Sequence, residues 1–103
     1  AIRAATNDYN NHIKGIADGD PDIAFVDIAS VLNQLNNGGL IYDGINFTGD
    51  FVSGGAFSLD GVHLSNRGYA VAANEFINAI NATFSANVPR VSVGDYENIE
   101  VTN

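Results

Sequence analysis

One apolar run, Ile23-Ala-Phe-Val-Asp-Ile28, most constrains what this chain can fold into. The run is nearly continuous in apolar residues and is bounded by turn-forming residues, which is typical of a strand buried on both faces of a parallel α/β sheet. A single strand of this kind cannot form a sheet by itself. We therefore expect partner strands in the region 40–57, in another chain, or in sequence that precedes residue 1.

Amphipathic helices are predicted on both sides of this run. The first begins at Ile2 and ends near Gly19, where an Asp-Gly-Asp-Pro-Asp stretch supplies a helix stop. Its apolar positions recur every three or four residues: Ile2, Ala5, Tyr9, Ile13 and Ile16. The second has Ser65 as its N-cap and runs to about residue 85. The stripe expected to form its buried face is Tyr69, Ala73, Phe76, Ile77, Ile80 and Phe84.

The rest of the chain is predicted to be less regular. Residues 29–35 suit one or two helical turns, which the breaker Asn36-Asn-Gly-Gly39 closes. Residues 40–57 alternate apolar residues with Gly and Asp, and they suit either a loose hairpin or an irregular functional loop. The composition changes after Pro89. We expect a domain portion over 1–87 and a C-terminal extension over 88–103 that forms an edge segment or a tail.

The size of the chain permits a real core. A compact globule of 10.8 kDa would expose about 5,500 Å² of surface. The 103 residues include no cysteine, so disulfides, thiolate catalysis and cysteine-ligated metals are excluded. No apolar run is long enough to cross a membrane. The lysine-poor, asparagine-rich composition favours an extracytoplasmic or secreted bacterial protein, although the lack of cysteine does not define the compartment.

The charge is strongly acidic, with 12 Asp and Glu against 4 Lys and Arg, which gives a formal net charge of −8. No Lys or Arg lies between Gly15 and Asn66. The resulting field repels nucleic acid, anionic membrane surfaces and strongly anionic substrates. A neutral or cationic small molecule is the better expectation for a ligand.

The residues that carry chemistry are concentrated in Phe57-Ser-Leu-Asp-Gly-Val-His-Leu-Ser-Asn-Arg-Gly-Tyr69, which runs directly into the second long helix. Asp60 and His63 are three residues apart, and Gly61 relaxes the backbone between them. A carboxylate bonded to one ring nitrogen of a histidine fixes its tautomer, so the other nitrogen can accept a proton from a hydroxyl nucleophile.

This segment, followed by an alanine-rich amphipathic helix, resembles the last conserved block of the SGNH (GDSL-type) lipases and acylhydrolases. The helix and apolar run before it resemble the final helix and strand that precede that block in the same family. The resemblance implies the C-terminal portion of a flavodoxin-like α/β/α sandwich and ester hydrolysis through an acyl-serine. Asp60 would orient His63, His63 would be the general base, and no cofactor is implied. Phe57 and Leu59, beside Asp60, are the candidates for contact with the substrate.

The family's Ser, Gly and Asn blocks do not occur in these 103 residues. The six serines are Ser30, Ser53, Ser58, Ser65, Ser85 and Ser92, and none follows a Gly-Asp pair. Ser65 is explained as a helix cap, and only Ser53, before two glycines, has a setting that could expose main-chain N–H groups. No nucleophile is therefore identified, and the chain is predicted to be inactive alone because the nucleophile and oxyanion donors dominate the rate.

Metal sites are not expected. Asp18, Asp20 and Asp22 have the spacing that opens a calcium loop, but Ile23 stands where glycine is needed, so a solvated turn is the better interpretation. A site formed by Asp60, His63 and either Asp43 or Asp50 lacks a further histidine.

Two classes of function remain. The first is a segment of a serine ester hydrolase that supplies the Asp-His part of a Ser-His-Asp triad and acts on a small-molecule, lipid or carbohydrate ester. The second is a non-catalytic interaction or oligomerisation module derived from the same fold. Half of a sandwich exposes apolar strand and helix surface, so both classes predict a homo-oligomer.

Overall fold

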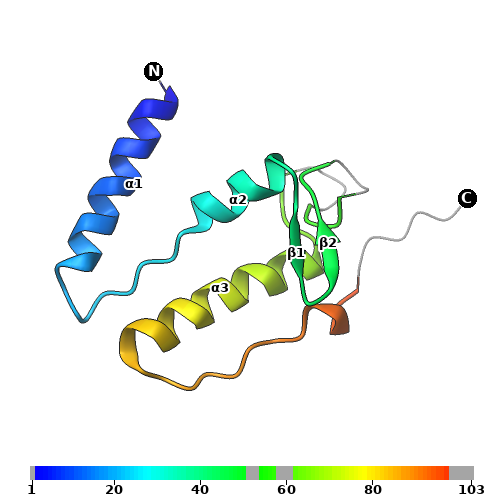
Figure 1. Ribbon diagram of the computed structural model, residues 1–103. Coiled ribbons are helices and arrows are strands. Elements are labelled where there is room, and N and C mark those ends of the chain that lie inside the picture. Colours follow the sequence, from blue (N-terminus) through cyan, green and yellow to red (C-terminus); the bar gives the residue numbers. More distant parts are fainter. Residues whose placement is uncertain (1, 51–53, 58–61, 98–103) are drawn as a thin grey trace, which may run out of the picture.

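The computed structural model describes residues 2–50, 54–57 and 62–97. These residues form a mixed α/β structure with three α-helices, one two-stranded antiparallel sheet and a short 3-10 helix. Helix α1 spans Ile2–Asp18, α2 spans Ile28–Asn36 and α3 spans Asn66–Phe84. Figure 1 shows α1 standing apart from the other elements, while α2, the hairpin and the start of α3 lie together. None of the described helices is long and apolar enough to cross a membrane.

Helices α1 and α3 confirm the two helices predicted from periodicity, and α2 lies where one or two helical turns were predicted. The carboxylate of Asp27 caps α2 by accepting a hydrogen bond from the main-chain N–H of Ser30 at 3.1 Å. The Ser65 hydroxyl caps α3 by accepting one from the N–H of Gly68 at 3.0 Å. Each cap satisfies a donor that the first turn of a helix leaves without an intrahelical partner.

A hairpin forms within the region for which a hairpin and an irregular loop were both predicted. Strands β1 (Leu40–Tyr42) and β2 (Ile45–Phe47) pair antiparallel, with Leu40 opposite Phe47. The two turn residues, Asp43 and Gly44, have φ values of 50° and 76°. An Asp-Gly pair adopts these positive angles readily, and the resulting turn matches the twist of the strands.

The prediction of a strand over Ile23–Ile28 is wrong for the described structure. Residues 23–27 have no regular secondary structure, and Ile28 begins α2. A strand requires hydrogen bonds from a neighbouring strand, and no strand lies beside this segment within the described residues. Residues 23–27 instead form a connection between α1 and α2, and Ile23 is exposed.

The core lies where the hairpin meets α2 and the first half of α3. Phe47 is only 1% exposed and Val93, in the 3-10 helix η1 (Val93–Asp95), is fully buried. The buried cluster consists of Leu35, Phe47, Ala56, Ala70, Val71 and Val93. Residues far apart in the sequence therefore share one small core.

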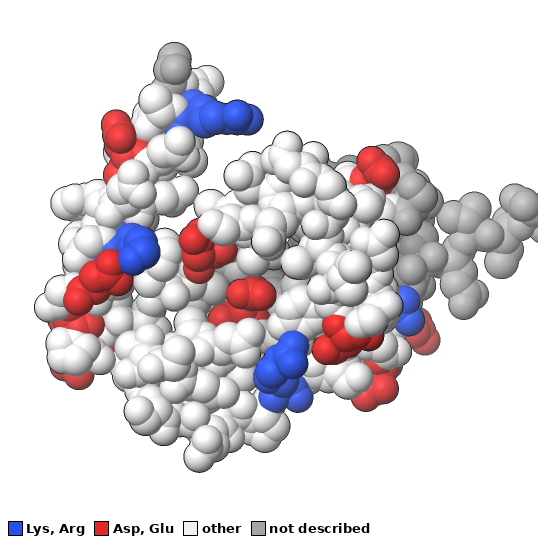
Figure 2. Space-filling model, in the orientation of Figure 1, with Lys and Arg blue, Asp and Glu red and all other residues white. Residues whose placement is uncertain are grey.

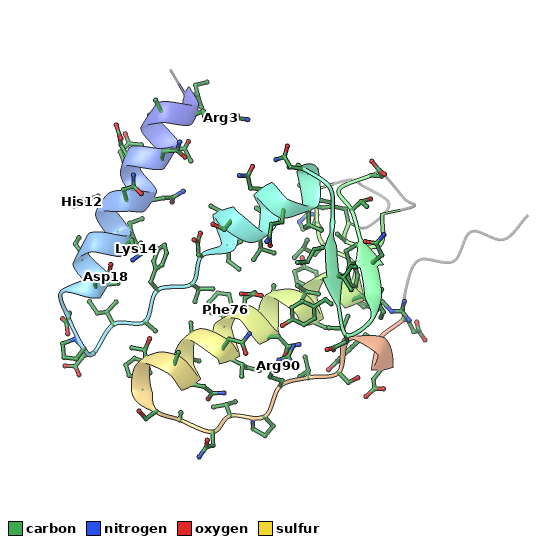
Figure 3. All side chains as sticks on the ribbon, viewed as in Figure 1. Arg3, His12, Lys14, Asp18, Phe76 and Arg90 are labelled. Carbon is green, nitrogen blue, oxygen red and sulfur yellow. The ribbon has the colours of Figure 1, made fainter. Side chains whose placement is uncertain are left out.

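The prediction that the apolar stripe of α3 is core is also wrong. The buried residues of α3 are Gly68, Ala70, Val71 and Asn74, on a different side of the helix. Tyr69, Phe76 and Phe84 are exposed, Phe76 by 52% (Figure 3). The apolar stripe of α1 is exposed as well: Ile2, Tyr9, Ile13 and Ile16. The described chain therefore buries one side of α3 and leaves the three aromatic side chains of the predicted stripe exposed, while Ile77 and Ile80 are half-buried.

The overall dimensions agree with this uncovered surface. The accessible surface is 7025 Å², compared with about 5,500 Å² for a compact protein of this mass. The radius of gyration is 15.3 Å, compared with about 13 Å for a compact domain of this length. The chain is therefore more extended than its length requires.

The segment after α3 is attached to the helix by side-chain hydrogen bonds. The Asn74 amide donates to the carbonyl oxygen of Val91 and accepts from its N–H, both at 2.8 Å. Asn81 makes the same pair of bonds with Val88 in an exposed setting. The expected boundary between residues 87 and 88 stays a prediction.

Candidate functional site

The candidate site is the loop that precedes α3. An isolated antiparallel bridge joins Phe57 to Leu64, so the two residues that flank residues 58–63 lie side by side. The main-chain N–H of Ser65 donates to the carbonyl oxygen of Ala56 at 2.9 Å, which adds a second connection at the same place. The base of the loop is therefore held at the N-terminus of α3.

The side chain of Ser65 holds the base of the loop in place through hydrogen bonds. It is buried, and its hydroxyl donates to the carbonyl oxygen of Gly55 at 2.6 Å while it accepts from the N–H of Gly68. The hydroxyl thus uses its one hydrogen within the scaffold. The predicted role of Ser65 as a helix cap is confirmed.

Gly68 permits the close approach of the loop to the helix. A Cβ atom at this position would overlap the carbonyl oxygen of Ala56 and would lie 3.1 Å from the Leu64 side chain. Only glycine lets the backbone of α3 lie this close to residue 56.

His63 is exposed and immediately precedes the bridge residue Leu64. Asp60 and Leu59 lie outside the described residues. The contact between Asp60 and His63 therefore stays a prediction, as does the contact of Leu59 with a substrate. Phe57 is half-buried and packs against the core cluster, at the base of the loop.

The described serines have other roles. Ser30 donates its hydroxyl to the Asp27 carboxylate at 2.8 Å in the capping arrangement of α2. Ser85 is the C-cap of α3, with a φ of 52°, and Ser92 precedes η1. Ser53 and Ser58 lie outside the described residues.

Three of the other acidic candidates have hydrogen-bond or ion-pair partners within the described residues. Asp18 forms an ion pair with Lys14 on α1 (Figure 3), and Asp20 accepts a hydrogen bond from the N–H of Asp22 at 2.9 Å. Asp43 accepts from the N–H of Val93 at 3.0 Å. Among the described residues, no group of three or more His, Asp or Glu side chains is arranged to hold a metal ion.

A cluster around Arg90 was not anticipated from the sequence. The Arg90 guanidinium lies 5.1 Å from the centre of the Tyr42 ring and 3.8 Å from the Asp43 carboxylate (Figure 3). This cluster attaches the C-terminal segment to the hairpin turn. The Asp43-Gly44 pair predicts the hairpin turn. It does not predict that Arg90, 47 residues after Asp43, contacts this turn.

Comparisons with family models, with curated protein sequences and with solved structures find no match to this chain.

Proposed function

We propose that this chain is the C-terminal segment of a serine ester hydrolase and that it supplies the Asp-His part of a Ser-His-Asp triad. The observation that carries the proposal is the sequence Asp60-Gly-Val-His63 on a loop whose ends are joined at the N-terminus of α3. A flavodoxin-like α/β/α sandwich, completed by strands outside the described residues, is part of the same proposal.

The joined loop base supports this role because catalytic side chains act best from a rigid scaffold. The Phe57–Leu64 bridge and the buried Ser65 hydroxyl limit the movement of the backbone at both ends of the loop. His63 is exposed at one of these ends, where a second reacting group can approach it. Orientation of this kind contributes a large part of the rate in acyl transfer.

Each residue has a defined role in the proposed reaction. Asp60 accepts a hydrogen bond from one ring nitrogen of His63, which holds the other nitrogen ready to accept a proton. The serine hydroxyl loses its proton to His63 as its oxygen bonds to the acyl carbon. The imidazolium then protonates the departing alcohol, and water releases the acid by the same steps in reverse. Phe57 and Leu59 would contact the acyl group.

The nucleophile is proposed to come from residues outside this sequence. The Ser65 hydroxyl, two residues from His63, is buried and donates to the Gly55 carbonyl oxygen. Ser30 is bonded to Asp27. Neither hydroxyl is available to transfer its proton to His63, and no Gly-Asp-Ser sequence occurs in the chain.

The first experiment tests the predicted pairing directly. Nitrogen-15 NMR of the two histidines reports which ring nitrogen carries the proton. We expect Asp60→Asn to change the tautomer populations of His63 and to leave His12 unchanged as the internal reference. Asp50→Asn is the control for loss of one carboxylate. Identical His63 spectra in the Asp60→Asn protein and the unsubstituted chain would rule out the dyad.

The second experiment tests the predicted inactivity of the chain alone. A fluorophosphonate labels a serine only when a base has activated it. Intact mass spectrometry after exposure is expected to show no adduct on any of the six serines. A single adduct that disappears in His63→Ala would place the nucleophile within these 103 residues and would contradict the assignment of the serine to other sequence.

A non-catalytic interaction module is the alternative. The observation that favours it is the exposure of large apolar side chains on α1 and α3, such as Tyr9 and Phe76. This alternative predicts that Asp60→Asn leaves both the His63 tautomer and the association of the chain unchanged.

A further inference from the structure

A shallow pocket lies between the hairpin turn, α3 and the segment that follows α3. Its volume is about 450 Å³, and it is lined by Ile41, Tyr42, Asp43, Asn78 and Arg90. Asn78 lies two residues after Phe76 on α3, so the two side chains leave opposite sides of the helix. The pocket is therefore separate from the exposed apolar stripe of α3, and none of its lining residues belongs to the loop that contains His63.

The hydroxyl group of Tyr42 is the unexplained feature of this pocket. It is buried and makes no hydrogen bond within the described residues. The Arg90 guanidinium lies 5.1 Å from the centre of the Tyr42 ring, but arginine has only donors and cannot accept the phenol hydrogen. A buried hydroxyl without an acceptor is unfavourable, and a ligand oxygen that accepts its hydrogen removes this cost.

The other polar groups of the pocket keep hydrogen-bonding capacity. One carboxylate oxygen of Asp43 accepts from the N–H of Val93 at 3.0 Å. The other lies 3.8 Å from Arg90 Nη2, which is longer than a hydrogen bond. Asn78 is exposed, and its side-chain amide makes no hydrogen bond to the residues that the structure describes. The pocket thus offers both donors and acceptors to a ligand.

The charges disfavour an ionic ligand. The Arg90 guanidinium interacts with the carboxylates of Asp43 and Glu75, so the pocket has no excess of positive charge. On the face shown in Figure 2, the described basic side chains are scattered and form no patch. The net charge of −8 repels anions, and the guanidinium repels cations inside the pocket. A neutral ligand suits the pocket best.

We propose that this pocket binds a neutral carbohydrate. A sugar hydroxyl both donates and accepts, so it fits between the Asp43 carboxylate and the Arg90 guanidinium, and a neighbouring hydroxyl oxygen accepts the hydrogen of Tyr42. The apolar C–H face of a sugar ring suits Ile41, which is 73% exposed. The Arg90 side chain is 47% exposed, so it has room to move aside from the phenol when the ligand enters.

The test uses the full chain and a panel of short cello-, xylo-, malto- and chito-oligosaccharides. Nitrogen-15 NMR follows the side-chain signals of Asn78 and Arg90 as each sugar is added. At least one oligosaccharide is expected to shift both signals and to saturate with a Kd on the order of 1 mM. The control ligand is the uncharged peptide Gly-Ser-Gly-Asn-Gly with blocked ends, which is expected to shift neither signal.

Two substitutions locate the binding. Tyr42→Phe is expected to weaken oligosaccharide binding about tenfold, and not to lower the melting temperature, because the hydroxyl that it removes has no partner in the unliganded chain. Tyr96→Phe, at an exposed tyrosine, is its matched control and is expected to leave binding unchanged. Asn78→Ala is expected to weaken binding about fivefold. Asn87→Ala, in the exposed connection after α3, is the control for loss of one amide.

Three outcomes would overturn the carbohydrate site. None of the oligosaccharides could shift the signals of Asn78 and Arg90. The peptide could shift them as strongly as the best oligosaccharide, which would assign the pocket to a peptide. The Tyr42→Phe variant could bind as tightly as the unsubstituted chain, which would show that the buried hydroxyl meets no ligand.

Discussion

The two ends of the molecule are built differently although each contains an amphipathic helix. At the hairpin end, α2, the hairpin, the first half of α3 and η1 bury Phe47 and Val93 almost completely. At the α1 end, Tyr9 is 71% exposed, and the connection after α1 has unpaired main-chain groups. The hairpin end therefore has a buried core, whereas no other described element covers the apolar surface at the α1 end.

This difference shows that amphipathic patterning and burial are separate properties. The stripe on α1 has the helical period as clearly as any in the chain, yet no described element covers it. The first half of α3 is buried through Gly68, Ala70, Val71 and Asn74, and at Gly68 the lack of a side chain permits the close approach of residue 56. The free energy of unfolding should therefore fall much more when a large apolar side chain is removed from the hairpin end than when one is removed from the exposed stripe of α1.

The largest expected difference is between two phenylalanines. Phe47→Ala removes a side chain that is 1% exposed and is expected to lower the free energy of unfolding by about 3–5 kcal/mol. Phe76→Ala removes the same side chain from an exposed position and is expected to change it by less than about 1 kcal/mol. Urea denaturation of both variants measures the two values. Equal losses would mean that the exposed stripe of α3 is covered in solution.

Substitutions at two glycines are expected to change the free energy of unfolding in opposite directions. Gly68→Ala introduces a Cβ that overlaps the Ala56 carbonyl oxygen and is expected to lower the free energy of unfolding by about 3 kcal/mol. Gly15→Ala, on α1, meets no atom within 4 Å. It is expected to stabilise the chain by about 0.5–1 kcal/mol, because alanine favours helix. Thermal unfolding of the two variants shows whether each is less or more stable than the unsubstituted chain. A Gly68→Ala variant as stable as the unsubstituted chain would disprove the close approach of Gly68 to Ala56.

The smallest of the three differences is between two asparagines with the same bonding pattern. Asn74→Ala leaves the part-buried N–H and carbonyl of Val91 without their partner and is expected to lower the free energy of unfolding by about 2 kcal/mol. Asn81→Ala exposes the corresponding groups of Val88 to water and is expected to lower it by about 0.5 kcal/mol. Chemical denaturation measures both, and equal losses would argue that residues 88–91 are not held mainly by Asn74.

Local signals predicted the long helices well. Helical periodicity and the cap at Ser65 predicted α1 and α3 nearly to their ends. The hairpin was predicted only as one of two alternatives for residues 40–57, although the Asp43-Gly44 pair is a strong hairpin signal. The strand over residues 23–28 was not found, because a strand exists only when a neighbour supplies hydrogen bonds. The apolar composition of such a segment indicates that it prefers to be buried. The composition does not indicate which element buries the segment.

The candidate site could be predicted only where it is local in the sequence. Asp60 and His63 are three residues apart, so their spacing suggested a dyad without knowledge of the fold. The structure adds the bridge between Phe57 and Leu64 and the internal bonds of the Ser65 hydroxyl, which depend on tertiary contacts. No sequence pattern indicated the role of Asn74, because its partner Val91 lies 17 residues away in a segment of different composition.

The hydrogen bond from Val93 to Asp43 spans 50 residues of sequence. During synthesis on the ribosome, the hairpin turn emerges long before the residue that completes its packing. Until the chain has been extended past η1, the hairpin turn therefore lacks the Val93 donor and the core that contains Phe47 is incomplete. Nascent chains of this protein thus pass through a long interval in which a chaperone that binds apolar segments competes with folding.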